Sequence, residues 1–372
     1  MTMASMAAFP VQGQEAARIP ALLDDGFPVP PANASRALRP YVLYPAWTGC
    51  AVLIAAQLVA PAFLLRIQYI PFAVSLVLFG LPHGAVDHLV VSWLRRRPAT
   101  PRRVAPIVVV YTGLVLAYLG LWSWRPGLAL ALFLVIALLH WGQGDYFFLV
   151  TFLGRPRPRS ILGVLLIWVV RGALPIALAS LAFPDQFAAV AGGILRPYGS
   201  GGTLAIPPQG RLIGLGLLGL LITAYTAQAL AAWNRDRAYL VWLDLGEIGV
   251  LLVLFLSVPA ILAVGVYFCL WHSIRHIARL LLAREPNLAS LRRRRIGRPL
   301  WNFARDALPA TLGALALLGG LYLLHPRSVS SVDGFVYLYL SLIAALTFPH
   351  VLVVLWMDDR QEVWRRTDMR PG

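Results

Sequence analysis

The chain has 372 residues, of which 59% are hydrophobic and only 13% are charged, whereas a soluble domain is about half apolar and about one quarter charged. The formal net charge is +16 and every basic residue is arginine, but the arginines gather in short blocks between apolar runs. A nucleic-acid-binding face needs a soluble surface on which such residues cluster. The composition therefore excludes nucleic acid as a partner and predicts a membrane protein.

The apolar runs have the length that spans a bilayer, about 20 residues at about 1.5 Å per residue. We predict an all-α integral membrane protein, a polytopic bundle of about 10 transmembrane helices. The expected spans are 44–65, 69–94, 104–123, 127–153, 160–182, 211–232, 238–257, 259–283, 304–324 and 334–357. The least certain boundary is the sequence SVPA around Pro259, which is either a tight turn or a kink in one long helix.

The arginines indicate how these spans are oriented. With ten spans and both termini cytoplasmic, most arginines fall on the cytoplasmic side, among them Arg95–Arg97 and Arg292–Arg295. This agrees with the excess of basic residues in cytoplasmic loops. Merging the two spans around Pro259 would move the LRRRRIGR loop to the outside, so ten spans are the better interpretation.

The remaining segments are predicted to be tails and one long loop. We expect a mobile cytoplasmic N-terminal tail over 1–41, a single helical transmembrane domain over 42–358, and a cytoplasmic C-terminal tail over 359–372. Residues 183–210 are rich in glycine and have two prolines near their end, which is typical of a loop, here an extracytoplasmic one. The expected location is the cell (plasma) membrane, which the chain crosses many times.

Six of the seven histidines lie inside the predicted spans, in four spans that run in the same direction. His83, His140 and His272 are each about 13 residues from the outer end of their span, and His350 is about 16 residues from it. At 1.5 Å per residue these imidazoles share one layer in the inner half of the hydrocarbon. Ionisable residues inside spans are rare and usually functional, so this layer is the candidate site.

Four of these histidines form a predicted metal site. His272 and His276, in WHSIRH, are four residues apart and therefore lie on one helix face. That spacing allows both rings to bind one metal ion; the alternative is two histidines that face a polar crevice. His83 and His140, the latter in HWGQGDYFFL, offer further imidazoles at the same depth. Neutral imidazoles suit Zn, Cu, Fe or Ni, so the ligand type alone does not choose the metal.

Other polar residues are expected to support these ligands. In GLPHGAVDH, His83 and His88 are about 140° apart around a regular helix, whereas Asp87 shares the face of His83. Asp87 is therefore expected to accept the second ring N–H of a ligand, directly or through a second helix. His88 joins this supporting shell or makes a structural hydrogen bond between helices. Asp145 is another candidate supporting carboxylate, and His350, in FPHVLV, is either a further polar group of the site or a packed histidine.

Two further groups of side chains flank the histidines. Asp244 and Glu247 are expected to form structural ion pairs with arginines of neighbouring spans. A set of aromatic residues packs in the core, faces lipid or, in the sharper alternative, lines the site of a long apolar substrate: Trp141, Tyr146, Phe147, Tyr267, Phe268 and Trp271. The chain lacks HExxH, a P-loop and a serine nucleophile elbow, which argues against zincin-type proteases, P-loop enzymes and serine hydrolases.

The histidine motifs resemble those of a known family. GLPHGAVDH (80–88), HWGQGD (140–145), YFCLWHSIRH (267–276) and TFPHVLV (347–353) are similar, in this order, to motifs of the Brp/Blh (bacteriorhodopsin-related protein) family of β-carotene 15,15′-dioxygenases. The resemblance covers most of the chain from the second span onward. It implies a helical membrane enzyme that holds Fe²⁺ in four histidines, which here are His83, His140, His272 and His276, and it implies no catalytic residue beyond the metal centre.

The implied reaction is cleavage of the central double bond of β-carotene by O₂ to give two molecules of all-trans-retinal. The implied partners are β-carotene and O₂ as substrates and the lipid bilayer as their source, with a retinal-binding rhodopsin as a candidate recipient of the product. Two alternatives stay open. One is a membrane protein without enzymatic activity that binds carotenoid, retinal or metal, or transports the metal. The other is an oxygenase with the same site that acts on a different polyene.

Overall fold

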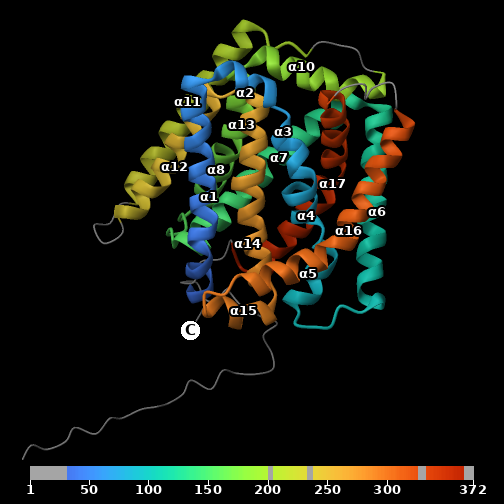
Figure 1. The fold of residues 1–372 in the computed structure, drawn as a ribbon. Coiled ribbons are helices and arrows are strands. Elements are labelled where there is room, and N and C mark those ends of the chain that lie inside the picture. Colours follow the sequence, from blue (N-terminus) through green and yellow to red (C-terminus); the bar gives the residue numbers. More distant parts are fainter. Residues whose placement is uncertain (1–31, 200–203, 233–237, 326–331, 364–372) are drawn as a thin grey trace, which may run out of the picture.

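The structure is a computed structural model that describes residues 32–199, 204–232, 238–325 and 332–363. Within these ranges the chain is helical and contains no strand. Ten helical segments of this described part are long and apolar enough to cross a membrane. The chain is therefore a multi-pass membrane protein with the expected all-α fold, and Figure 1 shows its long helices gathered into one bundle.

Five spans lie in the first half of the chain. The first is α1 (Ala32–Val59), and the second consists of α3 (Ile70–Ser75), η1 (Leu76–Gly80), α4 (Leu81–Gly84) and α5 (Asp87–Leu94). The third is α6 (Pro101–Trp124), and the fourth is α7 (Pro126–Phe148) with η2 (Leu149–Leu153). The fifth consists of α8 (Ile161–Ala173), η3 (Leu174–Leu178) and α9 (Ala179–Ala182).

The other five spans follow a short helix, α10 (Pro184–Leu195), and the turn η4 (Arg196–Tyr198). They are α11 (Pro208–Ala231), α12 (Ala238–Ser257), the run of α13 (Ala260–Val266), η6 (Tyr267–Ser273) and α14 (Ile274–Ala283), then α16 (Gly297–Leu324) and α17 (Val332–Arg360). Two more short helices, α2 (Pro61–Ile67) and α15 (Glu285–Arg292), lie between spans.

Most predicted boundaries agree with these helices, and the first span is the clearest exception. The SVPA sequence separates α12 from α13, because the residue before a proline is pushed out of the helical conformation. The first span was predicted at 44–65, but α1 already begins at Ala32 and ends at Val59, before Pro61. Residues 32–41 of the predicted N-terminal tail are therefore the first turns of α1. Arg36, Arg39 and Pro40 lower the mean hydropathy of these turns, so a search for apolar runs does not include them in the span.

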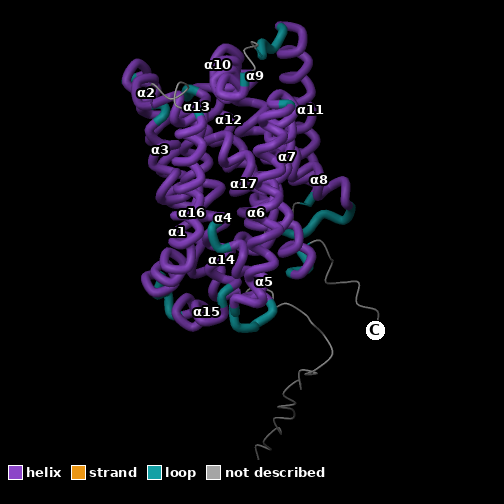
Figure 2. The backbone as a smooth tube through the Cα atoms, turned by 90° about the vertical axis from the view of Figure 1, so that its right-hand side faces the viewer, coloured by secondary structure: helices purple, strands orange, loops and turns teal. Residues whose placement is uncertain are grey.

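Residues 1–31 and 364–372 of the predicted tails lie outside the described residues, whereas Asp359 and Arg360, at the start of the predicted C-terminal tail, are the last residues of α17. The predicted loop over 183–210 contains α10, which lies across one end of the bundle, opposite α5 and α15, in both views (Figures 1 and 2). Gln186 Oε1 of α10 accepts a hydrogen bond of 2.8 Å from the backbone N–H of Ala260. This contact satisfies one of the N–H groups that the start of α13 leaves without a helical partner.

The helix that carries His140 is fixed by a close helix–helix contact. A Cβ atom on Gly142 of α7 would lie 1.8 Å from the carbonyl oxygen of Trp168, and one on Gly172 of α8 would lie 1.7 Å from that of Leu138. The two backbones therefore touch, as small residues allow in membrane helices. A side chain at either glycine would collide with the backbone of the other helix. The two glycines therefore determine where α7 packs along α8.

Candidate metal centre

Five histidine rings from four spans lie together inside the bundle. His83 belongs to α4, His140 to α7, His272 to η6, His276 to α14 and His350 to α17, and all five side chains are buried. The centroids of neighbouring rings are 4.9–6.4 Å apart. The structure thus brings the four predicted ligands together and adds His350 to them.

The ring nitrogens of this cluster fit a metal ion. The Nε2 atoms of His140, His272, His276 and His350 are buried and have no hydrogen-bond partner in the described structure. Buried polar atoms without a partner are costly and rare, so these nitrogens are expected to bind something. A metal–nitrogen distance of about 2.1 Å places the centroids of two coordinated rings about 4.6 Å apart at a right angle and about 6.5 Å apart on opposite sides. The observed separations fall within this range.

Hydrogen bonds at the second ring nitrogen orient two of the predicted ligands. His83 Nδ1 lies 3.2 Å from the carbonyl oxygen of Phe79, and His140 Nδ1 lies 3.3 Å from Oε1 of Gln143. Both partner atoms accept hydrogen bonds, so Nδ1 carries the ring proton and Nε2 keeps the lone pair that a metal needs. Gln143 was not predicted from the sequence, although its position one turn after His140 is a signal that could have found it.

A buried ion pair holds Gln143 in this orientation. Its Nε2 donates a hydrogen bond of 2.7 Å to Asp358 Oδ2, and Asp358 Oδ1 pairs with the Arg279 guanidinium at 2.7 Å. Arg279 in turn donates to Gln361 Oε1 and lies 3.9 Å from the centre of the Phe147 ring. Because the amide N–H group faces the carboxylate, the amide oxygen faces His140.

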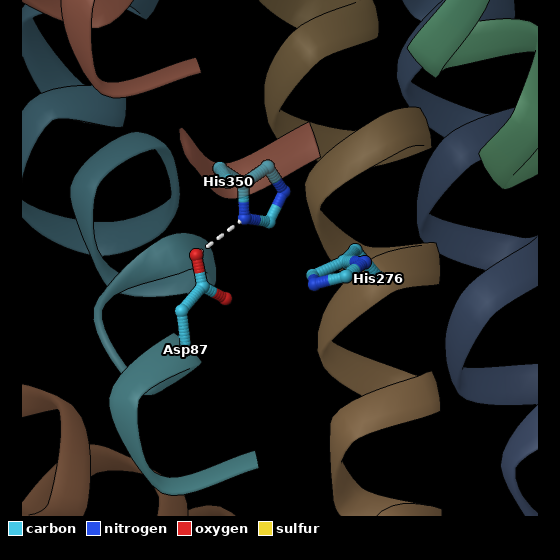
Figure 3. Close-up of side chains that lie close together, drawn as sticks. All are labelled: Asp87, His276 and His350. Carbon is cyan, nitrogen blue, oxygen red and sulfur yellow. Dashed lines mark hydrogen bonds and ion pairs between the residues drawn. The ribbon is translucent and has the colours of Figure 1, made fainter. Parts of the chain in front are cut away.

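Asp87 bonds to a histidine of a second helix, His350, although the sequence places it on the face of His83. Asp87 Oδ2 accepts a hydrogen bond of 2.7 Å from His350 Nδ1 (Figure 3). The prediction assumed one continuous helix from His83 to Asp87, but α4 ends at Gly84 and α5 begins at Asp87. Asp87 thus begins a new helical segment, and its carboxylate faces His350 of α17, whose ring centroid lies 5.0 Å from that of His83.

A group of three potential metal-binding atoms also differs from the predicted set of four. One atom from each of Asp87, His276 and His350 lies within 4.8 Å of the others. In Figure 3 these side chains come from α5, α14 and α17 and surround one common space. Only His276 was predicted as a ligand, whereas Asp87 and His350 were predicted as supporting residues.

Two of the histidines lie within a segment of π-helix or shortly after one. His272 lies within η6, and His83 follows η1 by three residues. A π-helical turn contains more residues than an α-helical one and occurs often at functional sites. The direction of the His272 ring is therefore set by this wider turn and not by the 3.6-residue period alone. His272 and His276 nevertheless both join the ring cluster, as their four-residue spacing predicts.

An apolar cavity of about 460 Å³ lies beside the histidines. His83, His140, His272 and His350 form part of its wall, and mostly apolar residues of α6, α16 and α17 form much of the rest. A second cavity of about 130 Å³ lies next to α10. The two cavities share the following lining residues: Phe133, Ala137, Trp141, Phe268 and Ile343.

The structure separates the predicted aromatic set into two groups. Trp141 and Phe268 line both cavities, with the Trp141 ring 5.8 Å from that of His272 and the Phe268 ring 5.6 Å from that of His83. The other four aromatic residues line neither of these cavities and are buried in the protein: Tyr146, Phe147, Tyr267 and Trp271.

His88 also lines the larger cavity, on α5, but it lies outside the ring cluster. Its side chain is half-buried. Since α5 begins after the helix interruption, His88 faces the cavity from a different element than His83. The structure thus assigns His88 to the cavity wall.

Asp145 bonds to arginines and to Trp271 rather than to a histidine. It accepts from Arg171 at 3.0 Å, from Arg275 at 2.8 Å and from Trp271 Nε1 at 3.1 Å. These contacts belong to a buried ion-pair network of six residues: Arg155, Arg171, Arg275, Asp145, Asp244 and Glu247. The network confirms the ion pairs predicted for Asp244 and Glu247.

Sequence comparison shows the family. The family model for β-carotene 15,15′-dioxygenase matches residues 74–358, which include every histidine of the cluster. The chain belongs to this family. It is 37% identical over 340 residues to the probable β-carotene 15,15′-dioxygenase Blh of Halobacterium salinarum. The aligned region covers 89% of this chain and 96% of that protein.

More distant members of the dioxygenase family match over much of their length as well. The probable β-carotene 15,15′-dioxygenase Brp of Halobacterium salinarum is 26% identical over 81% of this chain and 86% of that protein. A β-carotene 15,15′-dioxygenase of the uncultured marine bacterium 66A03 is 24% identical over 76% of this chain and 91% of that protein. No solved structure matches the chain significantly. The family assignment agrees with the resemblance of the histidine motifs.

Proposed function

We propose that this chain cleaves the central 15,15′ double bond of β-carotene with O₂ and releases two molecules of all-trans-retinal. The bond that breaks is one carbon–carbon double bond, and each of its two carbons receives one oxygen atom of O₂. The observation that carries the proposal is the group of buried, unpartnered imidazole nitrogens at the wall of an apolar cavity. Membership of the dioxygenase family supplies the substrate and the reaction type.

We assign Fe²⁺ to this cluster, with His83, His140, His272 and His276 as its ligands. Imidazole is a ligand that suits iron, although it does not select iron over zinc or copper. When bound, Fe²⁺ supplies the binding and activation of O₂. The residues of the chain hold the imidazoles in place through Phe79 and Gln143, and no protein acid or base is assigned to the cleavage.

The shape of the two cavities offers a way to select the central bond. β-Carotene is long and apolar and has no polar group by which a protein could fix its position along the site. We propose that its two halves occupy the two cavities, which meet at Trp141 and Phe268 beside His272 and His83. The central double bond then lies where the two cavities meet, next to the histidines.

The larger cavity reaches the outer apolar surface of the bundle. Val108 and Leu116 of α6 line this cavity and are 43% and 57% exposed. α16 lines the same cavity with Ala310, Gly313, Ala314 and Leu317. A substrate dissolved in the hydrocarbon can therefore enter between α6 and α16 without passing through water. This route fits a substrate that has no solubility outside the bilayer.

The central test uses purified protein in lipid nanodiscs with Fe²⁺, β-carotene and ¹⁸O₂. Retinal is expected as the only carotenoid product, with the labelled oxygen in its aldehyde group. Longer apocarotenals as the only products would contradict central cleavage. Bound carotenoid without turnover would instead indicate a binding protein, and movement of metal into sealed vesicles would indicate a transporter.

A matched pair of substitutions tests the two-cavity arrangement. Val190→Trp narrows the second cavity, so it is expected to lower kcat/KM for β-carotene about 10-fold while the iron content stays at the wild-type value. The same change at Val253, which is 49% exposed on α12, serves as the control. A shorter apocarotenal that fills only the larger cavity should be cleaved equally by both variants. Equal loss with both substrates would contradict the proposal.

We further propose that the protein lies in the cell (plasma) membrane with both termini cytoplasmic, and that a retinal-binding rhodopsin takes up the product. The distribution of arginines between loops supports this orientation. A reporter enzyme that is active only in the cytoplasm, fused after Gly372, should be active. An inactive reporter on a folded protein would show that the C-terminus lies on the opposite side of the membrane.

A further inference from the structure

We propose that His350 is a ligand of the same metal ion and that Asp87 is the positioning residue that orients it. This inference rests on the metal site of the proposed function. It extends the set of four histidines by a fifth imidazole from the last span, α17.

The position of His350 within the cluster is the first argument. Its ring centroid lies 5.0 Å from that of His83, 4.9 Å from that of His140 and 4.9 Å from that of His276. It therefore contacts rings from three other helices. His350 Nε2 is buried and has no partner in the described structure, as for His140, His272 and His276. A packed structural histidine would not leave this nitrogen unsatisfied at the centre of the cluster.

The second argument is the hydrogen bond at the other ring nitrogen. Asp87 Oδ2 accepts from His350 Nδ1 at 2.7 Å, which places the ring proton on Nδ1 and the free lone pair on Nε2. The Tyr111 hydroxyl lies 3.2 Å from the same carboxylate oxygen and 3.2 Å from the carbonyl oxygen of Leu346. A carboxylate behind a histidine is the usual arrangement at metal sites, where it fixes the tautomer and makes the ligand more basic.

The local backbone brings these two residues together. A Cβ atom on Gly84 would lie 3.4 Å from His350 Nδ1 and 3.7 Å from Asp87 Oδ2, so the end of α4 packs against both residues of the pair. After Gly84 the helix is interrupted, and α5 begins with Asp87. Asp87 is thus the first residue of α5, from which its carboxylate reaches His350.

One alternative is that Asp87 binds the metal directly. Its Oδ1 is buried without a partner, and an atom of Asp87 lies within 4.8 Å of atoms of His276 and His350. Two histidines and one carboxylate are a known ligand set for iron in oxygenases. The geometry favours the positioning role, because Asp87 Oδ2 already accepts from His350 and lies within hydrogen-bond distance of Tyr111.

The experiment measures metal affinity of the purified apo-protein, without carotenoid, with Co²⁺ as a spectroscopic probe and with Fe²⁺ under anaerobic conditions. His350→Ala is expected to weaken binding by more than about 100-fold, as loss of a ligand should, and Asp87→Asn by about 10–100-fold. In the His350→Ala background, Asp87→Asn should cause no further loss, because Asp87 acts through His350. His325→Ala, which changes a histidine outside the cluster, is the control and should bind as the wild type does.

Each alternative outcome is decisive. Wild-type affinity in His350→Ala overturns the proposal. If the losses of metal affinity from the two single substitutions multiply in the double variant, Asp87 is a direct ligand and its positioning role is overturned. His350→Gly with and without added imidazole separates ligation from folding, since imidazole should restore the Co²⁺ spectrum only if position 350 binds the metal. Retinal formation with full iron retention in His350→Ala would remove this inference alone, whereas binding through His350 without any cleavage would remove the proposed function alone.

Discussion

The transmembrane domain buries two polar clusters, and they differ in how far their atoms are satisfied. In the ion-pair network, each of Asp145, Asp244 and Glu247 contacts two arginines. In the histidine cluster, four Nε2 atoms have no partner within the described residues. Both clusters are expensive to place inside a membrane. Contacts among the residues of the ion-pair network offset the cost of burying their charges. The histidine cluster leaves nitrogen lone pairs that need a ligand. This difference is the one expected between a structural cluster and a functional one.

The two clusters share one helical segment, in which neighbouring residues face different ways. In WHSIRH, Trp271 and Arg275 contact the carboxylate of Asp145, while His272 and His276 contact the rings of His83 and His140. The four-residue spacing therefore occurs twice, once for each cluster. A substitution in one pair tests whether the clusters act separately.

The largest effect is expected from removing a ligand. His272→Ala should lose bound iron and retinal formation together, with metal affinity reduced by more than about 100-fold, while the protein still inserts and folds. The iron content is measured on the purified protein and retinal by chromatography. Stoichiometric iron in this variant would contradict the assignment of His272.

Breaking the ion-pair network should show the opposite pattern. Arg171 is completely buried and contacts all three carboxylates, so Arg171→Met leaves an uncompensated negative charge. We expect a loss of about 3–5 kcal/mol in the free energy of unfolding, measured by denaturant titration in micelles, with normal iron content in the fraction that stays folded.

The control for this variant is Arg305→Ala, which breaks the pair with Asp306 at a position that is 57% exposed. An exposed pair contributes at most about 1 kcal/mol. Equal destabilisation by the two substitutions would show that the buried network is not the source of stability. Loss of iron from folded Arg171→Met would show that the two clusters are coupled.

An intermediate effect is expected at Gln143, which lies between His140 and the Asp358–Arg279 pair. Gln143→Leu keeps the volume but removes the hydrogen bond at His140 Nδ1. Metal affinity should fall by about 10–100-fold, measured by competition with a chelator. Gln143→Glu retains an acceptor for His140 but brings a second carboxylate against Asp358, so it is combined with Asp358→Asn, which supplies the donor in its place. This double variant should bind more tightly than the leucine variant; the reverse order would exclude an orienting role.

The smallest effect is expected at Trp271, which precedes His272 in the chain and bonds to Asp145 of the ion-pair network. Trp271→Phe keeps the ring but removes one of the hydrogen bonds to Asp145, which still contacts Arg171 and Arg275. The free energy of unfolding should drop by about 1 kcal/mol, with iron content unchanged. A loss as large as that of Arg171→Met would mean that the arginines alone do not satisfy Asp145.

The fold was largely predictable from the sequence. Apolar runs of bilayer length fixed ten spans, and Pro259 separated two of them as expected. The start of α1 was missed because it carries Arg36 and Arg39, and the helix α10 was taken for a loop because of its short length and paired glycines. Length and hydropathy detect membrane spans, but they do not detect short helices at the surface.

The depth of the site residues along their spans was predictable from the sequence, but the direction of their side chains around the helices was not. Counting residues along the spans placed His83, His140 and His272 in one layer, and their rings do meet. The partner of Asp87 was not predictable, because it depends on the helix interruption after Gly84. The aromatic residues were equally ambiguous, since a span that is apolar on all sides does not reveal which face lines a cavity. Trp141 and Phe268 were therefore indistinguishable from Tyr146 and Phe147.

The π-helical segment η6 also limits how the chain length can change. Deleting one residue within Tyr267–Leu270 would return this segment to regular α-helix, because a π-helical turn contains more residues than an α-helical one. α13 would keep the face that it turns towards Phe72, whose ring packs near Gly265 and Phe268. The extra residue of η6 accordingly sets the direction of the side chains within this segment, His272 among them, rather than the packing of the helix that precedes it.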